Sequence, residues 1–273
     1  MSAETPPRPI GFLSDFGYTD EFVAVCHAVI RTVDHRIDVI DISHGIEPGD
    51  LRRGAMALSS FAAYSPATVL LAVVDPGVGG DRRALALKAG DCNLVGPDNG
   101  LLMLAADRLG EVDEAVEISD TPVRLQPASN TFHGRDIFSP VAAHLAVGAA
   151  LTDIGEPVDA SGLVRIDLPV AEVSEEEIVC HVLISDHYGN LTLNLDGALL
   201  EGSFLGRVDG VRVRTAAGPA RMRVCRTFAE AAEDEAVLYR DSSGSLALAV
   251  NHGSAAERFG LVPDDEVKLA PVP

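Results

Sequence analysis

The chain has 273 residues, 47% of them hydrophobic, and its 41 acidic residues against 21 basic ones give a net charge of -20. The hydrophobic share is large enough for a buried core, which excludes a wholly disordered chain. The negative charge repels polyphosphates and anionic lipids, so we expect no nucleic-acid partner and no membrane partner. Four isolated cysteines predict free thiols, and the lack of a long apolar run or a leader-like start predicts a cytoplasmic protein.

Strand-like and helix-like segments alternate through the first half of the chain. Helical spacing of apolar residues after Asp20 and Asp50 predicts helices capped by these carboxylates. Residues 67–74 are apolar on both faces, which is typical of a central strand in a parallel sheet. We therefore predict an α/β domain over residues 8–157, with a mostly parallel sheet flanked by helices. The expected strands cover 9–14, 38–42, 67–74, 84–87 and 93–95, and the expected helices cover 21–30, 51–63, a segment from Asn99, and 139–150.

The pattern changes after Gly155. Residues 158–176 are interpreted as a linker, because the stretch is rich in Pro, Asp and Glu. Short alternating runs separated by Gly, Asp and Ser then predict a smaller all-β domain over residues 177–273, resembling an antiparallel barrel. The expected strands there cover 178–184, 190–194, 204–213, 236–239 and 245–250.

Polar, glycine-rich segments follow two of the predicted strands. In an open α/β sheet, ligands lie at the carboxyl ends of the strands, so Asp15 and Asp20 in segment 14–20 are expected to face a crevice. Carboxylates there can hold ribose hydroxyls or an ammonium group. The glycines of segment 74–83 predict a tight turn that brings Asp75 near Arg82. Neither a dinucleotide fingerprint nor a phosphate-binding loop is present.

Three further segments carry polar side chains. Segment 95–100 predicts a turn that shapes a pocket wall, and segment 131–140 places His133 in a glycine-flanked polar loop before a helix, which favours a catalytic role. Segment 185–194 predicts either a plain hairpin turn or a small-molecule surface. The second interpretation uses a carboxylate, a ring and an amide, supplied by Asp186, Tyr188 and Asn190.

Taken in chain order, these segments resemble the S-adenosyl-L-methionine (SAM) hydroxide adenosyltransferases, the hydrolytic relatives of fluorinases and chlorinases. The resemblance spans roughly residues 9–268. It implies that SAM is hydrolysed to adenosine and L-methionine, with no cofactor and no metal ligand. The motifs that carry it are Asp-Phe-Gly at 15–17, Asp-Pro-Gly-Val-Gly at 75–79, Gly-Pro-Asp at 96–98, Phe-His-Gly-Arg-Asp at 132–136 and Asp-His-Tyr-Gly-Asn at 186–190.

The resemblance also implies roles for single residues. Asp75, Arg82 and His133 match the family's Asp-Arg-His triad around a water that attacks the ribose 5′ carbon. A cationic arginine would stabilise developing hydroxide, while either Asp75 or His133 could accept its proton. In this family the site lies between the α/β domain of one subunit and the β domain of the next, within a homotrimer.

Eight other positions match the family's substrate contacts. By the resemblance, Asp15 would hold the ribose hydroxyls, and Asp20 and Asp186 would hold the methionine ammonium group. The remaining matches contact the adenine, ribose and methionine parts of the substrate: Tyr188, Asn190, Ser242, Asn251 and His252.

Three other functions stay open. A halide-dependent, chlorinase-like transferase is disfavoured, because halogenating relatives have an aromatic residue at the Asp75 position and lack the histidine. Fluorinases also carry an extra loop, which the twelve residues between Arg83 and Gly96 are too few to form. A non-catalytic SAM- or adenosine-binding module would not need the triad. A metal-dependent hydrolase using Asp75 and Asp136 lacks HxH or HExxH spacing.

Overall fold

The computed structural model describes residues 5–215 and 217–272. The chain divides into two compact units, with the division between Ile166 and Asp167, inside residues 158–176. Across the described ranges, no helix combines the length and the apolar character needed to cross a membrane. All four cysteines are buried and free, which confirms the prediction of free thiols.

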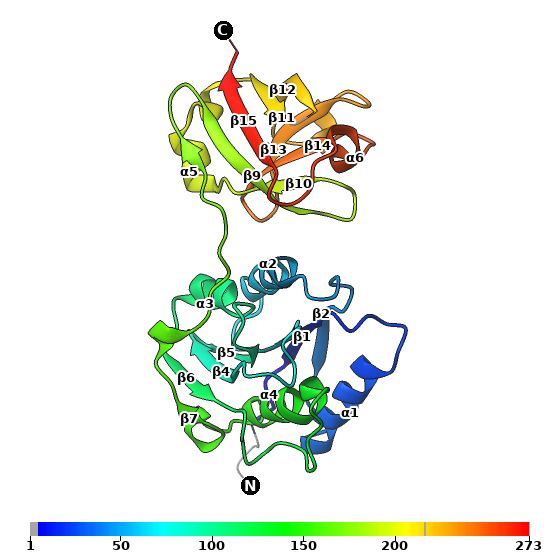
Figure 1. Cartoon of the computed structure of the whole chain (residues 1–273), viewed down its shortest axis with the longest axis vertical. Helices are drawn as coiled ribbons and strands as arrows, with labels where there is room; N and C mark the ends of the chain where they lie inside the picture. The colour runs from blue at the N-terminus through cyan, green and yellow to red at the C-terminus, as the bar shows by residue number, and fades with distance from the viewer. Residues whose placement is uncertain (1–4, 216, 273) are drawn as a thin grey trace. The chain divides into compact units, whose positions relative to one another are not determined.

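A mixed seven-stranded sheet forms the centre of the N-terminal unit, in the order β2-β1-β3-β5-β4-β6-β7 (Figure 1). The prediction of a mostly parallel sheet is correct only for β2, β1, β3 and β5, and the other pairings are antiparallel. A two-residue turn at Gly90 and Asp91 joins β4 to β5, and so short a connection forces an antiparallel hairpin. The strands are β1 (Ile10–Ser14), β2 (Val39–Ser43), β3 (Val69–Val73), β4 (Ala84–Ala89), β5 (Cys92–Pro97), β6 (Glu114–Glu117) and β7 (Glu156–Pro157).

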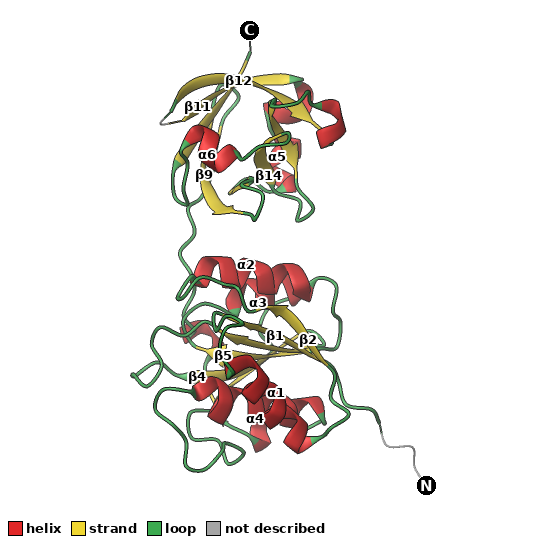
Figure 2. Ribbon diagram, turned by 90° about the vertical axis from the view of Figure 1, so that its right-hand side faces the viewer, coloured by secondary structure: helices red, strands yellow, loops and turns green. Residues whose placement is uncertain are grey.

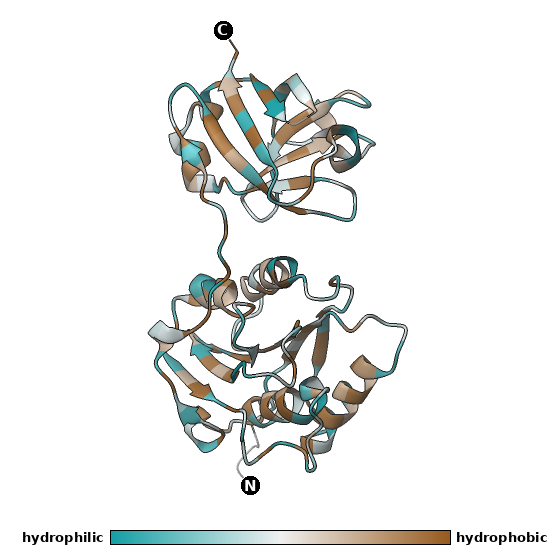
Figure 3. Cartoon of the chain, viewed as in Figure 1, coloured by the Kyte–Doolittle hydropathy of each residue, from teal (hydrophilic) through white to brown (hydrophobic). Residues whose placement is uncertain are grey.

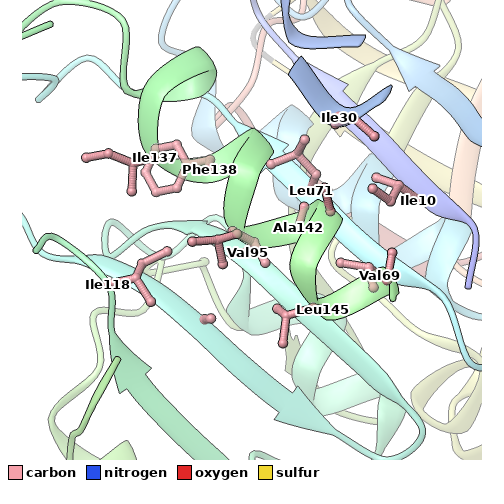
Figure 4. Close-up of a cluster of buried hydrophobic side chains, with 14 of the residues drawn as sticks. Ile10, Ile30, Val69, Leu71, Val95, Ile118, Ile137, Phe138, Ala142 and Leu145 are labelled. Carbon is pink, nitrogen blue, oxygen red and sulfur yellow. The ribbon is translucent and has the colours of Figure 1, made fainter. Parts of the chain in front are cut away.

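Helices cover both faces of this sheet (Figure 2). α1 (Phe22–Val33) and α4 (Ser139–Ala146) pack on one face, and α2 (Leu51–Ala62) and α3 (Met103–Leu109) pack on the other. Every residue of β3 is buried, which confirms its central position. Figure 4 shows the first of the two cores, where Leu71 and Val95 of the sheet lie near Ala142 and Leu145 of α4.

The helix ends differ in part from the predictions. Asp50 caps α2, since its Oδ1 accepts a hydrogen bond from Arg53 N at 3.0 Å. The predicted Asp20 cap is wrong, because α1 has Glu21 at its N-cap position and no side-chain cap. α3 begins at Met103, four residues after Asn99, whose Nδ2 donates to the Val74 carbonyl oxygen at 2.8 Å and whose Oδ1 accepts from Leu101 N at 3.2 Å.

The C-terminal unit is a closed barrel of seven strands. The pairing order β10-β14-β13-β12-β11-β15-β9 closes through β9 and β10, and β8 pairs with β9 outside the ring. The β12–β13 pair is parallel and the other pairs are antiparallel. Closure removes the free sheet edges. The strands are β8 (Glu172–Val173), β9 (Ile178–Ser185), β10 (Leu191–Leu193), β11 (Gly210–Thr215), β12 (Gly218–Cys225), β13 (Ala236–Arg240), β14 (Leu246–Val250) and β15 (Glu266–Pro271).

Hydrophobic and hydrophilic residues alternate along the barrel strands (Figure 3). In β11, for example, Val211 and Val213 are buried while Arg212 and Arg214 are exposed. The predicted strand 204–213 is wrong over its first half, where Phe204–Arg207 forms a 3-10 turn. Two short helices, α5 (Gly197–Gly202) and α6 (Ala255–Phe259), complete the unit.

Candidate active site

The carboxyl ends of β1 and β3 lie side by side, since Ser14 pairs with Val73. The next residue, Asp15, donates its N–H to the Val73 carbonyl oxygen at 3.3 Å, and its Oδ2 accepts from Gly49 N at 2.9 Å. Burial raises the pKa of the Asp15 carboxyl group, and the negative charge of nearby Asp75 adds to the rise. Two carboxylates therefore face the same small region.

Asp75, Arg82 and His133 form one hydrogen-bonded cluster. Arg82 Nε donates to both carboxylate oxygens of Asp75 at 3.0 Å, and Arg82 Nη2 lies 2.7 Å from His133 Nδ1. The side chains of Asp75 and Arg82 are only 5% and 11% exposed. The structure thus brings together the three residues that the sequence analysis assigned to catalysis, in a setting where charge interactions are weakly screened.

The arginine fixes the protonation state of His133. A guanidinium group has only donors, so His133 Nδ1 must accept from Arg82 and cannot carry a proton. Burial lowers the pKa of His133, and the positive charge of Arg82 lowers it further. A neutral His133 with its proton on Nε2 follows from both observations.

Glycines let the loop after β3 fold against the loop that carries His133. Gly79 has φ +76°, and a Cβ atom there would overlap the Asn130 carbonyl oxygen. A Cβ at Gly77 would lie 3.3 Å from Arg82 Cγ. The close approach of the two loops therefore depends on the absence of side chains, as the predicted tight turn requires.

Aromatic rings join the Asp15 loop to the His133 loop. Phe16 packs edge-on against Phe132 at 5.7 Å between ring centroids, and Phe22 packs against Phe132 at 5.3 Å. A Cβ on Gly134 would lie 2.8 Å from the Phe16 ring. Sequence reasoning missed these contacts, although Phe16 and Phe132 belong to the motifs Asp-Phe-Gly and Phe-His-Gly-Arg-Asp.

Asp136 holds the His133 loop in shape. It is 1% exposed, its Oδ1 accepts from Arg135 Nε at 2.6 Å, and its Oδ2 accepts from Ser129 N at 2.7 Å. Directly after His133, a π-helical turn at Gly134–Phe138 leads into α4. These bonds give Asp136 a structural role and do not favour the metal-dependent hydrolase that would pair it with Asp75.

A cavity of about 430 Å³ opens beside Arg82 and His133. Its other walls come mainly from the segment 119–130, which the bonds to Asp136 hold in place. The cavity therefore reaches Arg82 and His133 of the cluster, whereas Asp75 is not among its lining residues.

The Gly-Pro-Asp motif, which ends β5 and begins the turn after it, supports the site from outside. Asp98 is 7% exposed, and its two oxygens accept from Arg83 Nε at 2.8 Å and from Val164 N at 2.9 Å. Asn99 donates to the carbonyl oxygen of Val74, the residue before Asp75. Through Asn99, this segment therefore reaches the backbone that positions the cluster.

Asp20 lies in the exposed loop between β1 and α1, which leaves its carboxylate facing solvent. Tyr18 of the same loop is 67% exposed. The structure therefore places Asp20 on the segment that follows Asp15, at the carboxyl end of β1.

In the C-terminal unit, Asp186 organises its own turn. Its Oδ1 accepts from Tyr188 N at 2.8 Å and Asn190 N at 2.9 Å, and its Oδ2 accepts from Asn190 Nδ2 at 2.8 Å. The Tyr188 side chain is 75% exposed. The turn is therefore the hairpin that the sequence allowed, with an exposed ring at its tip.

The other predicted positions of this unit lie on two further loops, since Asn251 and His252 follow β14 whereas Ser242 lies in the turn between β13 and β14. Gly189 of the Asp186 turn touches the loop 251–254, because a Cβ there would overlap Ser254. Asn251 Nδ2 donates to the Ala231 and Ala232 carbonyl oxygens, and His252 adopts φ +61°. Ser242 is exposed beside Asp241, whose Oδ1 accepts from Ser243 N and Ser245 N and was missed by sequence reasoning.

Comparison with known proteins gives one consistent family. The family model described as SAM hydroxide adenosyltransferase N-terminal domain matches residues 10–155, and the corresponding C-terminal domain model matches residues 180–268. The chain is similar to a Salinispora tropica protein named (R)-S-adenosyl-L-methionine hydrolase, at 47% identity over 264 residues that cover 96% of this chain and 98% of that protein.

Two less similar proteins also align with 96% of this chain. A fluorinase of Actinopolyspora mzabensis is 29% identical over 291 residues, covering 96% of this chain and 97% of that protein. The crystal structure of an uncharacterized conserved protein from Thermotoga maritima aligns with a TM-score of 0.88 at 34% identity, covering 96% of this chain and 100% of that chain.

The close approach of the loops at Gly79 should contribute to stability. A left-handed alanine costs about 1–2 kcal/mol and overpacking costs about 1–3 kcal/mol, so we expect Gly79→Ala to lower the free energy of unfolding by about 2–5 kcal/mol in urea titrations. Gly148→Ala is the matched control, because Gly148 has φ +98° but, among the described residues, no atom beyond its own chain neighbours within 4 Å of where a Cβ would lie. Equal losses in the two variants would show that the loops do not need this close approach.

Proposed function

Because this chain belongs to the SAM hydroxide adenosyltransferase family, we propose that it hydrolyses SAM to adenosine and L-methionine. The similar hydrolase shares 47% of its aligned residues with this chain, against 29% for the fluorinase. The observation that carries the proposal is the cluster of Asp75, Arg82 and His133. A carboxylate at this position repels a halide ion but accepts a hydrogen bond from water, which favours hydrolysis.

In the proposed reaction, a water oxygen attacks the ribose 5′ carbon in line with the sulfonium sulfur. The C5′–O bond forms, the C5′–S bond breaks, and the electron pair of that bond neutralises the sulfur to give the thioether of methionine. The sulfonium is a good leaving group and needs no acid. The protein therefore has to align the water and shield it from bulk solvent.

We propose Asp75 as the group that accepts the proton of this water. The neutral His133 ring carries its proton on Nε2, so it can orient the water as a donor but has no free lone pair there. An ionised Asp75 is acceptor-only. Arg82, bonded to both residues, would stabilise the negative charge that develops on the oxygen.

Asp15 and Asp20 are proposed as the substrate contacts of this unit. Asp15 follows β1 next to Asp75, and its partly buried carboxylate suits two ribose hydroxyls. Asp20, exposed on the same loop, suits the methionine ammonium group. SAM carries positive charge at sulfur and at the ammonium nitrogen, so carboxylates complement it.

The remaining contacts and the assembly are proposed from the family resemblance. A homotrimer would use the C-terminal unit of one copy to complete the site of the next. In that arrangement the substrate meets three loops of the barrel, which carry the predicted residues Asp186, Tyr188, Asn190, Ser242, Asn251 and His252.

Incubation of the purified protein with SAM tests which products form, and the same assay on an Asp75 variant tests which group is the base. Incubation with SAM should release adenosine, with or without EDTA, and should form no halogenated nucleoside when chloride or fluoride is added. Asp75→Asn keeps the shape but removes the proton acceptor, so we expect kcat to fall about 100- to 10,000-fold with little change in KM. Asp81→Asn, at an exposed position of the same loop, is the matched control and should keep its activity.

Chromatography of the nucleosides distinguishes the outcomes. A halogenated nucleoside would contradict hydrolysis, and SAM binding without turnover would indicate a binding module. Full activity of Asp75→Asn would show that another group takes the proton.

The rate of hydrolysis should depend on pH through His133. Burial and the charge of Arg82 lower the pKa of His133 below its ordinary value of 6.5. Protonation would remove the Nδ1 lone pair that accepts from Arg82 and would place two cations side by side. We therefore expect kcat, measured at saturating SAM so that Asp15 stays ionised, to be constant near neutral pH and to fall as the pH drops through a value below 6.5. The His133→Gln variant should not show this fall in rate. A fall centred above pH 6.5 would contradict the assignment of this pH dependence to His133.

Two inactive variants should complement each other if neighbouring copies share each site. Neither His133→Ala nor Asp186→Ala should be active alone, but co-refolded mixtures should regain activity. Random mixing in equal amounts leaves about a quarter of the sites intact. No recovery in mixtures whose trimeric mass is verified by sedimentation would show that sites are not shared between subunits.

A further inference from the structure

Two histidines and one aspartate meet on the N-terminal unit, outside the cluster of Asp75, Arg82 and His133. His27 comes from α1, Asp41 from β2, and His44 from the loop directly after β2. His27 Nε2 lies 2.8 Å from Asp41 Oδ1, and His44 Nε2 lies 3.1 Å from the same oxygen. One ligand atom from each residue lies within 4.8 Å of the other two.

His44 presents a buried nitrogen to the cluster. Its side chain is 0% exposed, and among the residues that the structure describes, Nε2 has no partner in full hydrogen-bond geometry and lies 3.1 Å from the carboxylate oxygen Asp41 Oδ1. A buried imidazole nitrogen left in this state is costly unless another group occupies its lone pair. A metal ion is such a group.

The other ring nitrogen of His44 is held in the way that metal sites use. His44 Nδ1 lies 2.7 Å from Ser14 Oγ, and this oxygen also accepts from Phe16 N at 3.3 Å. If Nδ1 donates its proton to Ser14 Oγ, Nε2 keeps a free lone pair directed at Asp41. Metal-bound histidines commonly donate their second N–H to such an oxygen, which fixes the ring and its tautomer.

The other groups around these three side chains suit a metal ion that has one coordination position open to solvent. Phe12 packs edge-on against the His44 ring at 4.6 Å, which gives the cluster an apolar inner wall. His27 and Asp41 are 30% and 34% exposed, so the outer side of the cluster is open to solvent. On a tetrahedral zinc ion with bonds of about 2.0–2.1 Å, ligand atoms lie about 3.3 Å apart, close to the spacing of these nitrogens and the shared oxygen.

We propose that His27, Asp41 and His44 form a binding site for a divalent transition ion of the Zn²⁺ type, separate from the SAM site. Two imidazoles and one carboxylate favour Zn²⁺ or Co²⁺ over Mg²⁺ or Ca²⁺, which prefer oxygen ligands. The ion ties α1 to the end of β2. It also fixes Ser14, the residue before Asp15, and it takes no part in the attack on SAM.

No pattern in the sequence indicates this site. Asp41 and His44 are three residues apart on a strand and its following loop, and His27 lies on the helix before that strand. No familiar metal-ligand spacing results, so the prediction of no metal ligands rested on motifs alone. Only the packing of α1 beside β2 brings the three side chains together.

Calorimetric titration of the chelator-treated, full-length protein with Zn²⁺ tests the proposal. We expect one ion per chain, and Co²⁺ should give the strong visible absorption of a four-coordinate site. Loss of a hydrogen-bond partner outside the ligand set already weakens metal sites about 10- to 100-fold, so His27→Gln and Asp41→Asn should each weaken Zn²⁺ binding about 100-fold or more. These partly exposed positions are chosen because replacement of buried His44 can impair folding.

His35→Gln is the matched control, since this histidine lies between α1 and β2 with its side chain 84% exposed. It should keep the wild-type affinity. Zn²⁺ should also raise the melting temperature of the wild-type protein and of His35→Gln, but not that of Asp41→Asn. Equal Zn²⁺ affinity in all variants, or no binding by the wild-type protein, would overturn the proposal. Hydrolysis of SAM in EDTA is measured separately, so either proposal can fail without the other.

Discussion

The N-terminal site depends on a single guanidinium group. Arg82 bonds to Asp75 and to His133, and it also lies over the ring of Phe138, 5.4 Å from the centroid. Phe138 is fully buried in the core between the sheet and α4, so Arg82 connects the reactive cluster to the hydrophobic interior. Removing one member of a buried ion pair leaves an uncompensated charge, at a cost of about 3–5 kcal/mol. The position of Asp75, the base that we propose, and the stability of its loop are therefore linked through one side chain.

The sequence predicts this site well where the determinant is local. A glycine-rich turn after a buried strand brings Asp75 to Arg82, and a glycine-flanked polar loop marks His133. Both features reflect backbone conformations that need glycine, and a short segment of sequence shows this need by itself. The contact between the two loops also needs Gly79 to pass close to Asn130, and nothing in either segment by itself indicates that approach.

The predictions fail where a side chain chooses between backbone partners. Asp20 could cap α1 but does not, and Asn99 bonds to the Val74 carbonyl oxygen and to Leu101 N but does not start α3. Short polar side chains have several local options of similar energy, and the tertiary fold decides among them. The antiparallel part of the sheet has a different cause, which is the length of a connection. The two-residue turn between β4 and β5 is too short to contain the crossover helix that a parallel pair needs.

The charges around Arg82 bear on the choice of nucleophile. Asp15 and Asp75 lie close enough that the charge of Asp75 contributes to the raised pKa of Asp15, while Arg82 is already paired with Asp75. Within the described part of the chain, one carboxylate of this site therefore remains without a matching cation. In the proposed complex, a cationic substrate such as SAM would supply positive charge near Asp15, and its binding would favour the ionised form of this carboxyl group. With the substrate bound, a halide would again leave a negative charge uncompensated, whereas water adds none, so the electrostatic balance that we propose attracts SAM also disfavours a halide as the attacking group.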